Sequence, residues 1–133
     1  MRVVFLCYLN SIRSPIAEGL MRLSHPDATV ESAGLAAGEL DELMVAVMRE
    51  RGIDMSTHDA RTLDEIEGHV DVAIALTTPA GEAAEAYFKD TDTVVETWEL
   101  PDPTRGYLDV RSMMNDYRSV RDNLEQRIAK RFP

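Results

Sequence analysis

The chain has 133 residues, 44% of them hydrophobic and 29% charged, and this composition is typical of a single globular domain spanning residues 1–133. Its net charge of −10 argues against a nucleic-acid partner, because the sequence offers no basic stripe that would displace counterions from a phosphate backbone. No apolar run approaches the length of a membrane span, the start of the chain lacks the features of a signal peptide, and one cysteine permits no internal disulfide, so we expect no membrane segment and a cytoplasmic location.

The first predicted elements surround the only cysteine of the chain. Val3 to Leu6 is a short apolar run, rich in β-branched residues, of the kind that forms a buried strand. Cys7 to Arg13 follow as a loop, and Ser14 is a favourable helix N-cap placed before Pro15, which suits a first helical position. Apolar residues at positions 16, 20 and 23 give this helix one buried face, and we expect it to end before residue 25.

The remaining chain continues the alternation of strands and helices. Strands are predicted over residues 29–32, 70–76 and 93–97, and the 70–76 run is apolar enough to be central. Helices are predicted over residues 40–51, where Gly52 ends the helix, and over 78–88. A short helix is predicted after Thr62, which forms a capping box with Glu65. The last helix is predicted over 110–128, with Asp109 as its N-cap. This order predicts an α/β three-layer fold with a central four-stranded parallel sheet and helices on both faces.

Ligands bind beyond the carboxyl ends of the strands in such a sheet. Cys7 lies at one such end, and Asp102 follows the 93–97 strand and can lie at another. A loop that closes onto a helix N-terminus presents unpaired N–H groups to an anion, and the same field favours a nucleophilic thiolate at Cys7. Arg13 is planar and permanently charged, which suits bidentate capture of an oxyanion. One cysteine and three scattered histidines form no metal-binding pattern, so we expect neither a metal nor a cofactor.

The loop resembles a known family signature. Low-molecular-weight protein tyrosine phosphatases carry C-x-G-N-x-C-R-S-P, and here the stretch is Cys7-Tyr8-Leu9-Asn10-Ser11-Ile12-Arg13-Ser14-Pro15. Further matches follow in the family's order, at Ile16-Ala17-Glu18, Ser32-Ala33-Gly34, Gly52-Ile53, His58-Asp59-Ala60-Arg61 and Asp102-Pro103. They cover nearly the whole chain. Related arsenate reductases share the same loop.

The resemblance implies a set of roles. Cys7 would attack phosphorus, and the phosphoryl group would be bound by the loop residues Tyr8, Leu9, Asn10, Ser11, Ile12, Arg13 and Ser14. Asp102 would protonate the leaving oxygen and then activate water, although an Asp-Pro pair by itself is also a common turn. Ser14 would donate to the Cys7 sulfur as well as cap the helix. Asn10, Ser32 and His58 would form a hydrogen-bond network that holds the loop, with Asn10 tolerating a left-handed backbone.

Three departures from the signature affect these expectations. Leu9 stands where the family has glycine, and a positive φ there would cost about 1–2 kcal/mol. Ile12 replaces the second cysteine, so Cys7 has no neighbour with which to form a protective disulfide. Thr104-Arg105 replaces the aromatic residue after Asp-Pro. This leaves Tyr8 or Trp98 to supply an aromatic wall, and it offers Arg105 to an acidic group or a second phosphate group of the substrate.

Three functions remain as alternatives. The first is a phosphatase whose substrate is a phosphorylated protein or a small phosphomonoester. The second is an arsenate reductase, which would need an external thiol or redoxin because the chain lacks further cysteines for an internal electron relay. The third is a phosphate-binding module with weak catalysis, which the replacement of glycine by Leu9 would suit.

Overall fold

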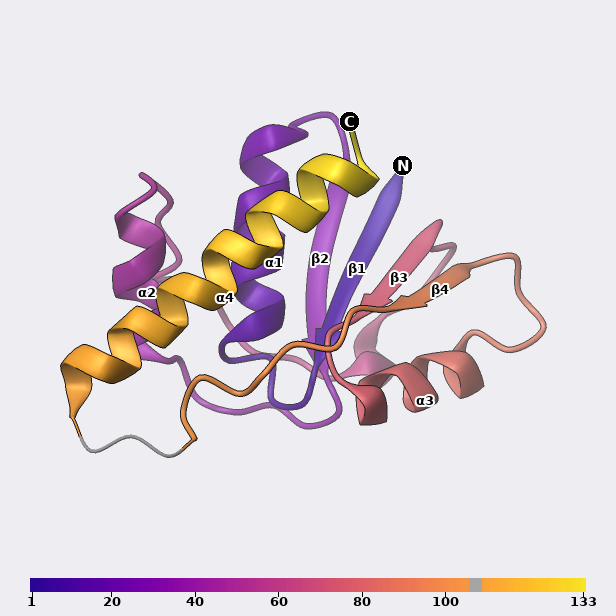
Figure 1. Ribbon diagram of the computed structural model, residues 1–133. Helices are drawn as coiled ribbons and strands as arrows, with labels where there is room; N and C mark the ends of the chain where they lie inside the picture. Colours follow the sequence, from indigo (N-terminus) through magenta and orange to yellow (C-terminus); the bar gives the residue numbers. More distant parts are fainter. Residues whose placement is uncertain (106–108) are drawn as a thin grey trace.

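The computed structural model describes residues 1–105 and 109–133, which form a parallel β-sheet covered by helices on both faces (Figure 1). The strands are β1 (Arg2–Cys7), β2 (Thr29–Gly34), β3 (Val72–Ala75) and β4 (Val94–Thr97), in the spatial order β2-β1-β3-β4. The helices are α1 (Arg13–Ser24), α2 (Glu42–Arg49), α3 (Thr78–Tyr87) and α4 (Val110–Arg131), with a short 3₁₀ helix η1 (Leu63–Glu65). Across these residues the predicted α/β fold class with a four-stranded parallel sheet is confirmed.

Strand β1 shows how side-chain alternation builds two cores. Val3, Phe5 and Cys7 pack with α1, α2 and α4, whereas Val4 and Leu6 pack with α3. Figure 1 shows α1, α2 and α4 together on one face of the sheet and α3 on the other. Helices on both faces are the reason that the strand is apolar throughout rather than alternating with polar residues.

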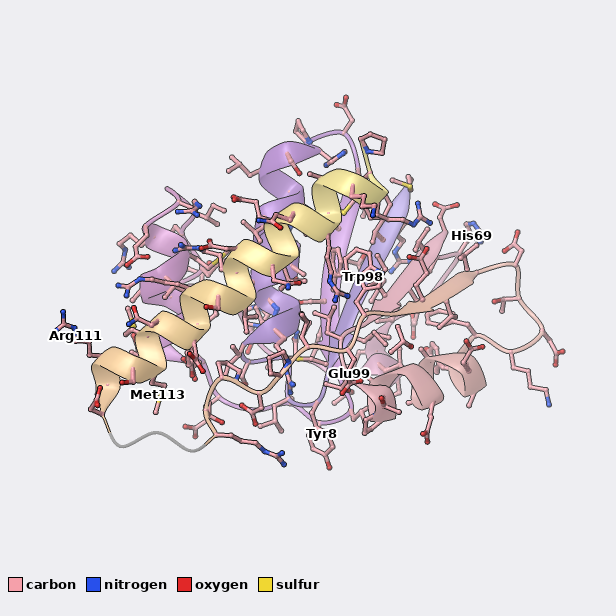
Figure 2. All side chains as sticks on the ribbon, in the orientation of Figure 1. Tyr8, His69, Trp98, Glu99, Arg111 and Met113 are labelled. Carbon is pink, nitrogen blue, oxygen red and sulfur yellow. The ribbon has the colours of Figure 1, made fainter. Side chains whose placement is uncertain are left out.

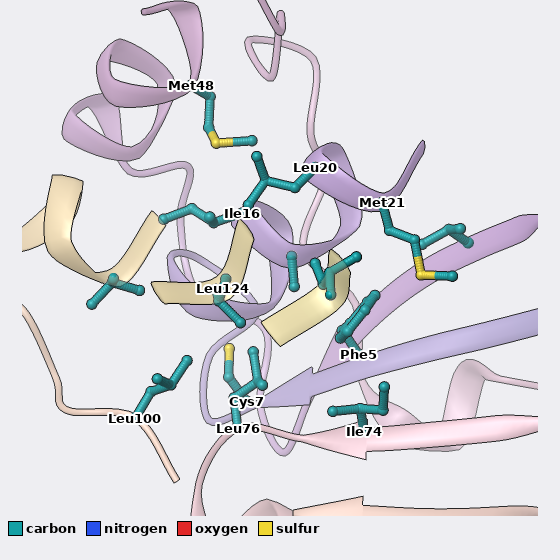
Figure 3. Close-up of a cluster of buried hydrophobic side chains, with 14 of the residues drawn as sticks. Phe5, Cys7, Ile16, Leu20, Met21, Met48, Ile74, Leu76, Leu100 and Leu124 are labelled. Carbon is teal, nitrogen blue, oxygen red and sulfur yellow. The ribbon is translucent and has the colours of Figure 1, made fainter. Parts of the chain in front are cut away.

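The larger core lies between the sheet and helices α1 and α4 (Figure 3). Phe5 and Ile74 from the sheet belong to one cluster with Ile16 and Leu124 from the helices, and none of these four side chains is exposed to solvent. Burying each such side chain stabilises the fold by roughly 1.5–3 kcal/mol. Cys7 lies in the same cluster at the end of β1, so its position is set by the core.

The ends of several elements follow the predicted signals. Gly52 follows α2 with a φ of +74°. The N–H of Gly52 donates to the carbonyl of Arg49, and the N–H of Ile53 donates to the carbonyl of Met48. These two bonds form a Schellman motif. Thr62 and Glu65 form the expected capping box on η1. Asp109 caps α4 by accepting a hydrogen bond from the N–H of Ser112 (2.7 Å).

The prediction of Ser14 as the N-cap of the first helix is wrong. Helix α1 begins at Arg13 behind Ile12, which makes no side-chain cap, and Pro15 therefore occupies the third helical position. Ser14 is fully buried, and its hydroxyl contacts Cys7 and Asn10 instead of the free N–H groups of the helix. The hydroxyl of Ser14 therefore serves hydrogen bonds within the loop, although serine by itself favours the N-cap position of a helix. Because the first N–H groups of a helix have no partner in the helix, Pro15 is tolerated at its position.

Parallel strands place their carboxyl ends at one edge of the sheet. Cys7 ends β1, Gly34 ends β2, and Thr97 ends β4 shortly before Asp102. Figure 1 shows the connections that follow these strands gathered at that edge. Among the helices that the structure describes, none is both long and apolar enough to cross a membrane.

Candidate active site

Cys7 lies at the end of β1 with its thiol turned into the protein. Its side chain is only 2% exposed, and Sγ lies 2.9 Å from Oγ of Ser14 in the first turn of α1. The strand fixes the cysteine backbone and the helix brings the hydroxyl to the sulfur. A hydroxyl at this distance can donate to a thiolate and so stabilise the sulfur both as a nucleophile and as a leaving group.

The peptide groups that follow Cys7 are oriented by hydrogen bonds from outside the loop. The carbonyls of Cys7, Tyr8, Leu9 and Asn10 accept hydrogen bonds from the N–H groups of Leu35 (3.3 Å), Ala36 (3.0 Å) and Gly38 (2.8 Å) and from Nε2 of His58 (2.8 Å). A trans peptide is planar, so the N–H group of each following residue points in the direction opposite to the carbonyl. The N–H groups of residues 8–11 therefore face away from these partners, and together they can cradle an oxyanion at Cys7.

Asn10 is the centre of the network that holds this loop. Its backbone is left-handed (φ +54°) and its side chain is fully buried. Nδ2 donates to the hydroxyls of Ser14 (2.9 Å) and Ser32 (2.9 Å), while Oδ1 accepts from the N–H of Arg61 (3.0 Å). With the bond from His58 to the Asn10 carbonyl, the structure brings together the three residues expected to form the network, Asn10, Ser32 and His58, and joins Ser14 to them. Positive φ falls on Asn10 and not on Leu9, so the leucine at the family's glycine position carries no left-handed strain.

Two members of this network were not assigned a role from the sequence. Glu18 is buried, accepts a hydrogen bond from Ser32 Oγ (2.5 Å) and pairs with Arg22 (2.8 Å), one helical turn further along α1. The spacing of four residues between an acid and an arginine was a signal for that pair. Arg61 contributes its backbone N–H to Asn10, and the sequence carries no pattern for such a contact.

Arg13 and Asp102 line the same cavity as Cys7. The cavity holds about 670 Å³ and opens where β1 and β4 end. Nη1 of Arg13 donates to the carbonyl of Leu100 (3.1 Å), which ties the first residue of α1 to the segment that carries Asp102. The three residues predicted to carry the chemistry therefore share one site.

The Asp102 carboxylate is held in a local turn. Oδ1 accepts hydrogen bonds from the N–H (2.9 Å) and the hydroxyl (2.6 Å) of Thr104. Burial by itself raises the pKa of Asp102, but the two bonds from Thr104 and the charges of Arg13 and Arg105 outweigh it and hold that pKa below its ordinary value. Asp102 thus forms a local turn with Thr104 and also lies in the cavity that contains Cys7, so both interpretations of the Asp-Pro pair fit this geometry.

The remaining loop residues form the walls of the cavity. Tyr8, Leu9, Ser11 and Ile12 line it, and Arg105 borders it as well. Tyr8 projects outward at the edge where β1 ends (Figure 2). Trp98 does not line the cavity: its ring meets Phe5 edge-on at 6.3 Å and its Nε1–H donates to Glu96 (3.3 Å), so it serves packing rather than an aromatic wall. Within residues 1–105 and 109–133, no cluster of acidic, histidine or cysteine side chains has the arrangement of a metal site.

Comparisons with known proteins agree with this geometry. A glutaredoxin arsenate reductase from Synechocystis is 32% identical over 132 residues, covering 96% of this chain and 92% of the relative. A low molecular weight protein-tyrosine-phosphatase from Acinetobacter johnsonii is 37% identical over 65 residues, 47% of this chain and 46% of the relative. The structure of a low molecular weight protein tyrosine phosphatase from T. tengcongensis superimposes with a TM-score of 0.82 at 26% identity, covering 98% of this chain and 96% of that one. The family model described as low molecular weight phosphotyrosine protein phosphatase matches residues 2–132, and the chain belongs to that family.

Proposed function

We propose that this protein hydrolyses phosphomonoesters through a cysteinyl-phosphate intermediate. The observation that carries the proposal is the shared cavity in which the Cys7 sulfur, the oriented N–H groups of the loop, Arg13 and Asp102 meet. The substrate would be a phosphorylated protein or a small phosphomonoester, met in the cytoplasm. Phosphotyrosine in a protein is one such substrate, and membership of the family supports this choice.

The reaction would proceed in two steps. The Cys7 thiolate attacks phosphorus, the S–P bond forms as the P–O ester bond breaks, and protonated Asp102 gives its proton to the leaving oxygen. Charge on the phosphoryl oxygens is stabilised by the loop N–H groups and by Arg13. Asp102, now a carboxylate, takes a proton from water as that water attacks phosphorus, and the S–P bond breaks to release phosphate. The Ser14 hydroxyl, 2.9 Å from Sγ, would stabilise the departing thiolate.

Arsenate reduction is the second candidate, and the name of the Synechocystis relative is the observation that favours it. Cys7 would attack arsenate with loss of water, and an external thiol or redoxin would then attack the Cys7 sulfur, releasing arsenite and leaving a mixed disulfide. A second external thiol would reduce this disulfide and regenerate Cys7, so that the two electrons come from the two external thiol groups. Cys7 is the only cysteine in the sequence, so an internal relay of disulfides is impossible. Asp102 suits either reaction, because the oxygen that leaves an ester and the oxygen that leaves arsenate as water both require a proton.

The test is steady-state hydrolysis of aryl phosphates by the wild type, Cys7→Ser and Asp102→Ala. We expect Cys7→Ser to abolish turnover while phosphate still binds. Asp102→Ala should slow esters with poor leaving groups by roughly 10²–10⁴-fold and slow activated esters less. Asp54 provides a matched control, because its carboxylate accepts the same pair of bonds from Ser56 (2.9 and 2.6 Å) outside the cavity, so Asp54→Ala should leave turnover unchanged.

Two results would overturn the proposal. Turnover that persists in Cys7→Ser would rule out the cysteine as nucleophile. Arsenite release with added thiols, in the absence of any ester hydrolysis by the wild type, would establish the reductase in its place. An equal loss on poor and activated esters in Asp102→Ala would remove that residue as the acid while leaving Cys7 as the nucleophile.

A further inference from the structure

Carboxylates outnumber arginines around the cavity that contains Cys7. The basic side chains that line it are Arg13 and Arg105, and the acidic ones are Glu39, Asp41, Glu99 and Asp102. The chain as a whole carries a net charge of −10, so no general excess of positive charge offsets this imbalance. In the proposed reaction Arg13 and the loop N–H groups bind the phosphoryl oxygens. The organic group of the substrate is therefore left in acidic surroundings.

Two of the four carboxylates already have roles within the protein. Asp41 accepts a hydrogen bond at Oδ1 from the N–H of Met44 (2.9 Å) and one at Oδ2 from the hydroxyl of Tyr117 (2.9 Å), so both of its oxygens are engaged. Asp102 is held by Thr104 and is the proposed acid of the reaction. The two glutamates are the carboxylates that remain for contact with a substrate.

Glu39 and Glu99 are exposed to solvent and have no basic partner within the protein. Across residues 1–105 and 109–133, neither glutamate lies within ion-pair distance of a lysine or an arginine. Elsewhere Glu18, Glu50 and Glu96 each pair with an arginine. The charges of the two glutamates at the cavity are therefore available to a group from outside the chain.

The fold fixes the positions from which the two glutamates reach the cavity. The hydroxyl of Thr78, the first residue of α3, donates to Oε2 of Glu99 (2.6 Å), and Figure 2 shows Glu99 beside that helix. Glu39 follows Gly38, whose N–H donates to the carbonyl of Leu9 (2.8 Å). One glutamate thus comes from the segment after β2 and the other from the segment after β4, and both line the same cavity.

We propose that Glu39 and Glu99 select phosphomonoesters with a positively charged organic group, namely a phosphorylated residue flanked by lysine or arginine in a peptide. The inference rests on the proposed phosphatase function and names its substrate class. Exposed ion pairs of this kind contribute modestly and are screened by salt, so they confer selectivity rather than tight binding. Arg105 would favour an acidic flank instead, but the two glutamates outnumber it.

The test compares three phosphotyrosine peptides whose residues on either side of the tyrosine are lysine, glutamine or glutamate. At low ionic strength we expect kcat/KM of the wild type to be about 3–10-fold higher for the lysine peptide than for the glutamine peptide, and lowest for the glutamate peptide. Added salt should reduce these differences. Glu39→Gln and Glu99→Gln should each lower the lysine preference about 2–3-fold, and the double variant should nearly abolish it.

The matched control is Glu85→Gln. Glu85 is exposed on α3 and lies outside the cavity, and its replacement removes the same single negative charge from the chain. This variant should keep the full lysine preference. The control separates a local contact at the cavity from attraction by the net charge of the protein, which all three single variants change equally.

Each other outcome contradicts the proposal in a distinct way. Equal kcat/KM for the three peptides in the wild type would show that the cavity does not distinguish charge. Preference for the glutamate peptide would assign the selection to Arg105. A lysine preference that persists in the double variant, or that falls as much in Glu85→Gln, would show that the two glutamates do not bind the substrate.

Hydrolysis of an aryl phosphate by the wild type is measured first and tests the phosphatase function separately. Absence of this hydrolysis would refute the phosphatase function and the substrate class with it. Hydrolysis of the aryl phosphate but of none of the peptides would leave the phosphatase in place and overturn the basic peptide as its substrate.

Discussion

Asp102 is the residue at which the two halves of the proposed reaction place opposite demands. It must be protonated to assist the leaving group and ionised to activate water. The bonds from Thr104 and the nearby arginines hold its pKa low, so the carboxylate form is favoured near neutral pH. The acid step therefore limits the reaction as the pH rises, and hydrolysis of esters with poor leaving groups should fall on the alkaline side.

Removing the Thr104 hydroxyl tests this directly. Thr104→Ala takes away one of the hydrogen bonds that stabilise the carboxylate, so the pKa of Asp102 should rise. A higher pKa keeps Asp102 protonated to higher pH, and the alkaline limb of kcat/KM for an ester with a poor leaving group should move to higher pH.

The matched control for that variant is Ser56→Ala. The Ser56 hydroxyl lies 2.6 Å from Oδ1 of Asp54 in the same kind of turn but outside the cavity. Loss of this hydroxyl should leave the alkaline limb of the kcat/KM profile at the same pH. An alkaline limb that stays fixed in Thr104→Ala would show that a group other than Asp102 controls the profile.

Single residues of the site were predictable where a motif named them. Cys7, Arg13 and Asp102 meet in one cavity, as strand ends of a parallel sheet suggested. Ser14 illustrates both the reach and the limit of the sequence: its expected contact with the Cys7 sulfur is present, whereas its expected capping of the helix is not, because capping preference is local and the closed loop places the hydroxyl at the sulfur. Arg61 acts on Asn10 through its backbone N–H, and any residue type could supply such a group.

At the scale of elements, the loop depends on the turn that follows β2. The segment after Gly34 supplies the N–H groups that bind the carbonyls of residues 7–9. A Cβ atom at position 34 would lie 2.5 Å from the carbonyl oxygen of Ala36 and 2.8 Å from both the nitrogen of Asn10 and the carbonyl oxygen of Tyr8. All three atoms belong to the backbone, so a side chain here can be accommodated only by moving the loop.

Gly34→Ala should therefore impair the site as well as the fold. We expect a destabilisation of about 1–3 kcal/mol, typical of overpacking, together with weaker binding of inorganic phosphate. Thermal unfolding and phosphate inhibition measure the two effects. Gly19→Ala is the control, because a Cβ atom there would meet the flexible ends of Met48 and Met55 in the core, and phosphate binding should be retained. Unchanged phosphate binding in Gly34→Ala would contradict the dependence of the loop on this turn.

The extents of most elements were predictable because their signals are local. Gly52 ends α2 and Asp109 starts α4 where the pattern of residues indicated. The strand predicted over 70–76 spans only Val72–Ala75, since apolar residues continue past the point where pairing with β1 ends. The predicted 40–51 helix begins at Glu42, because Asp41 caps it by accepting from the N–H of Met44 (2.9 Å).

At the scale of the whole molecule, topology unites a site whose parts are far apart in sequence. The order β2-β1-β3-β4 places Cys7, Gly34 and the segment leading to Asp102 at one edge, over a core that holds β1 rigid. The alternation of strands and helices was sufficient to predict this arrangement. The activity was not predictable in the same way, because phosphatases and arsenate reductases share the loop. In the two proposed reactions the first step is the same attack by Cys7, and only the group that attacks next differs: water for the phosphatase, a thiol for the reductase.

The most direct test of the account is detection of phosphate on Cys7. Wild type, Asp102→Ala and Cys7→Ala are mixed with an activated aryl phosphate, quenched in acid and analysed by mass spectrometry of the peptide that carries residue 7. We predict that this peptide gains the mass of one phosphoryl group, most strongly in Asp102→Ala because loss of the base slows hydrolysis of the intermediate, and that Cys7→Ala gains none. Hydrolysis that proceeds in the wild type while no phosphoryl group ever appears on Cys7 in Asp102→Ala would contradict the central claim.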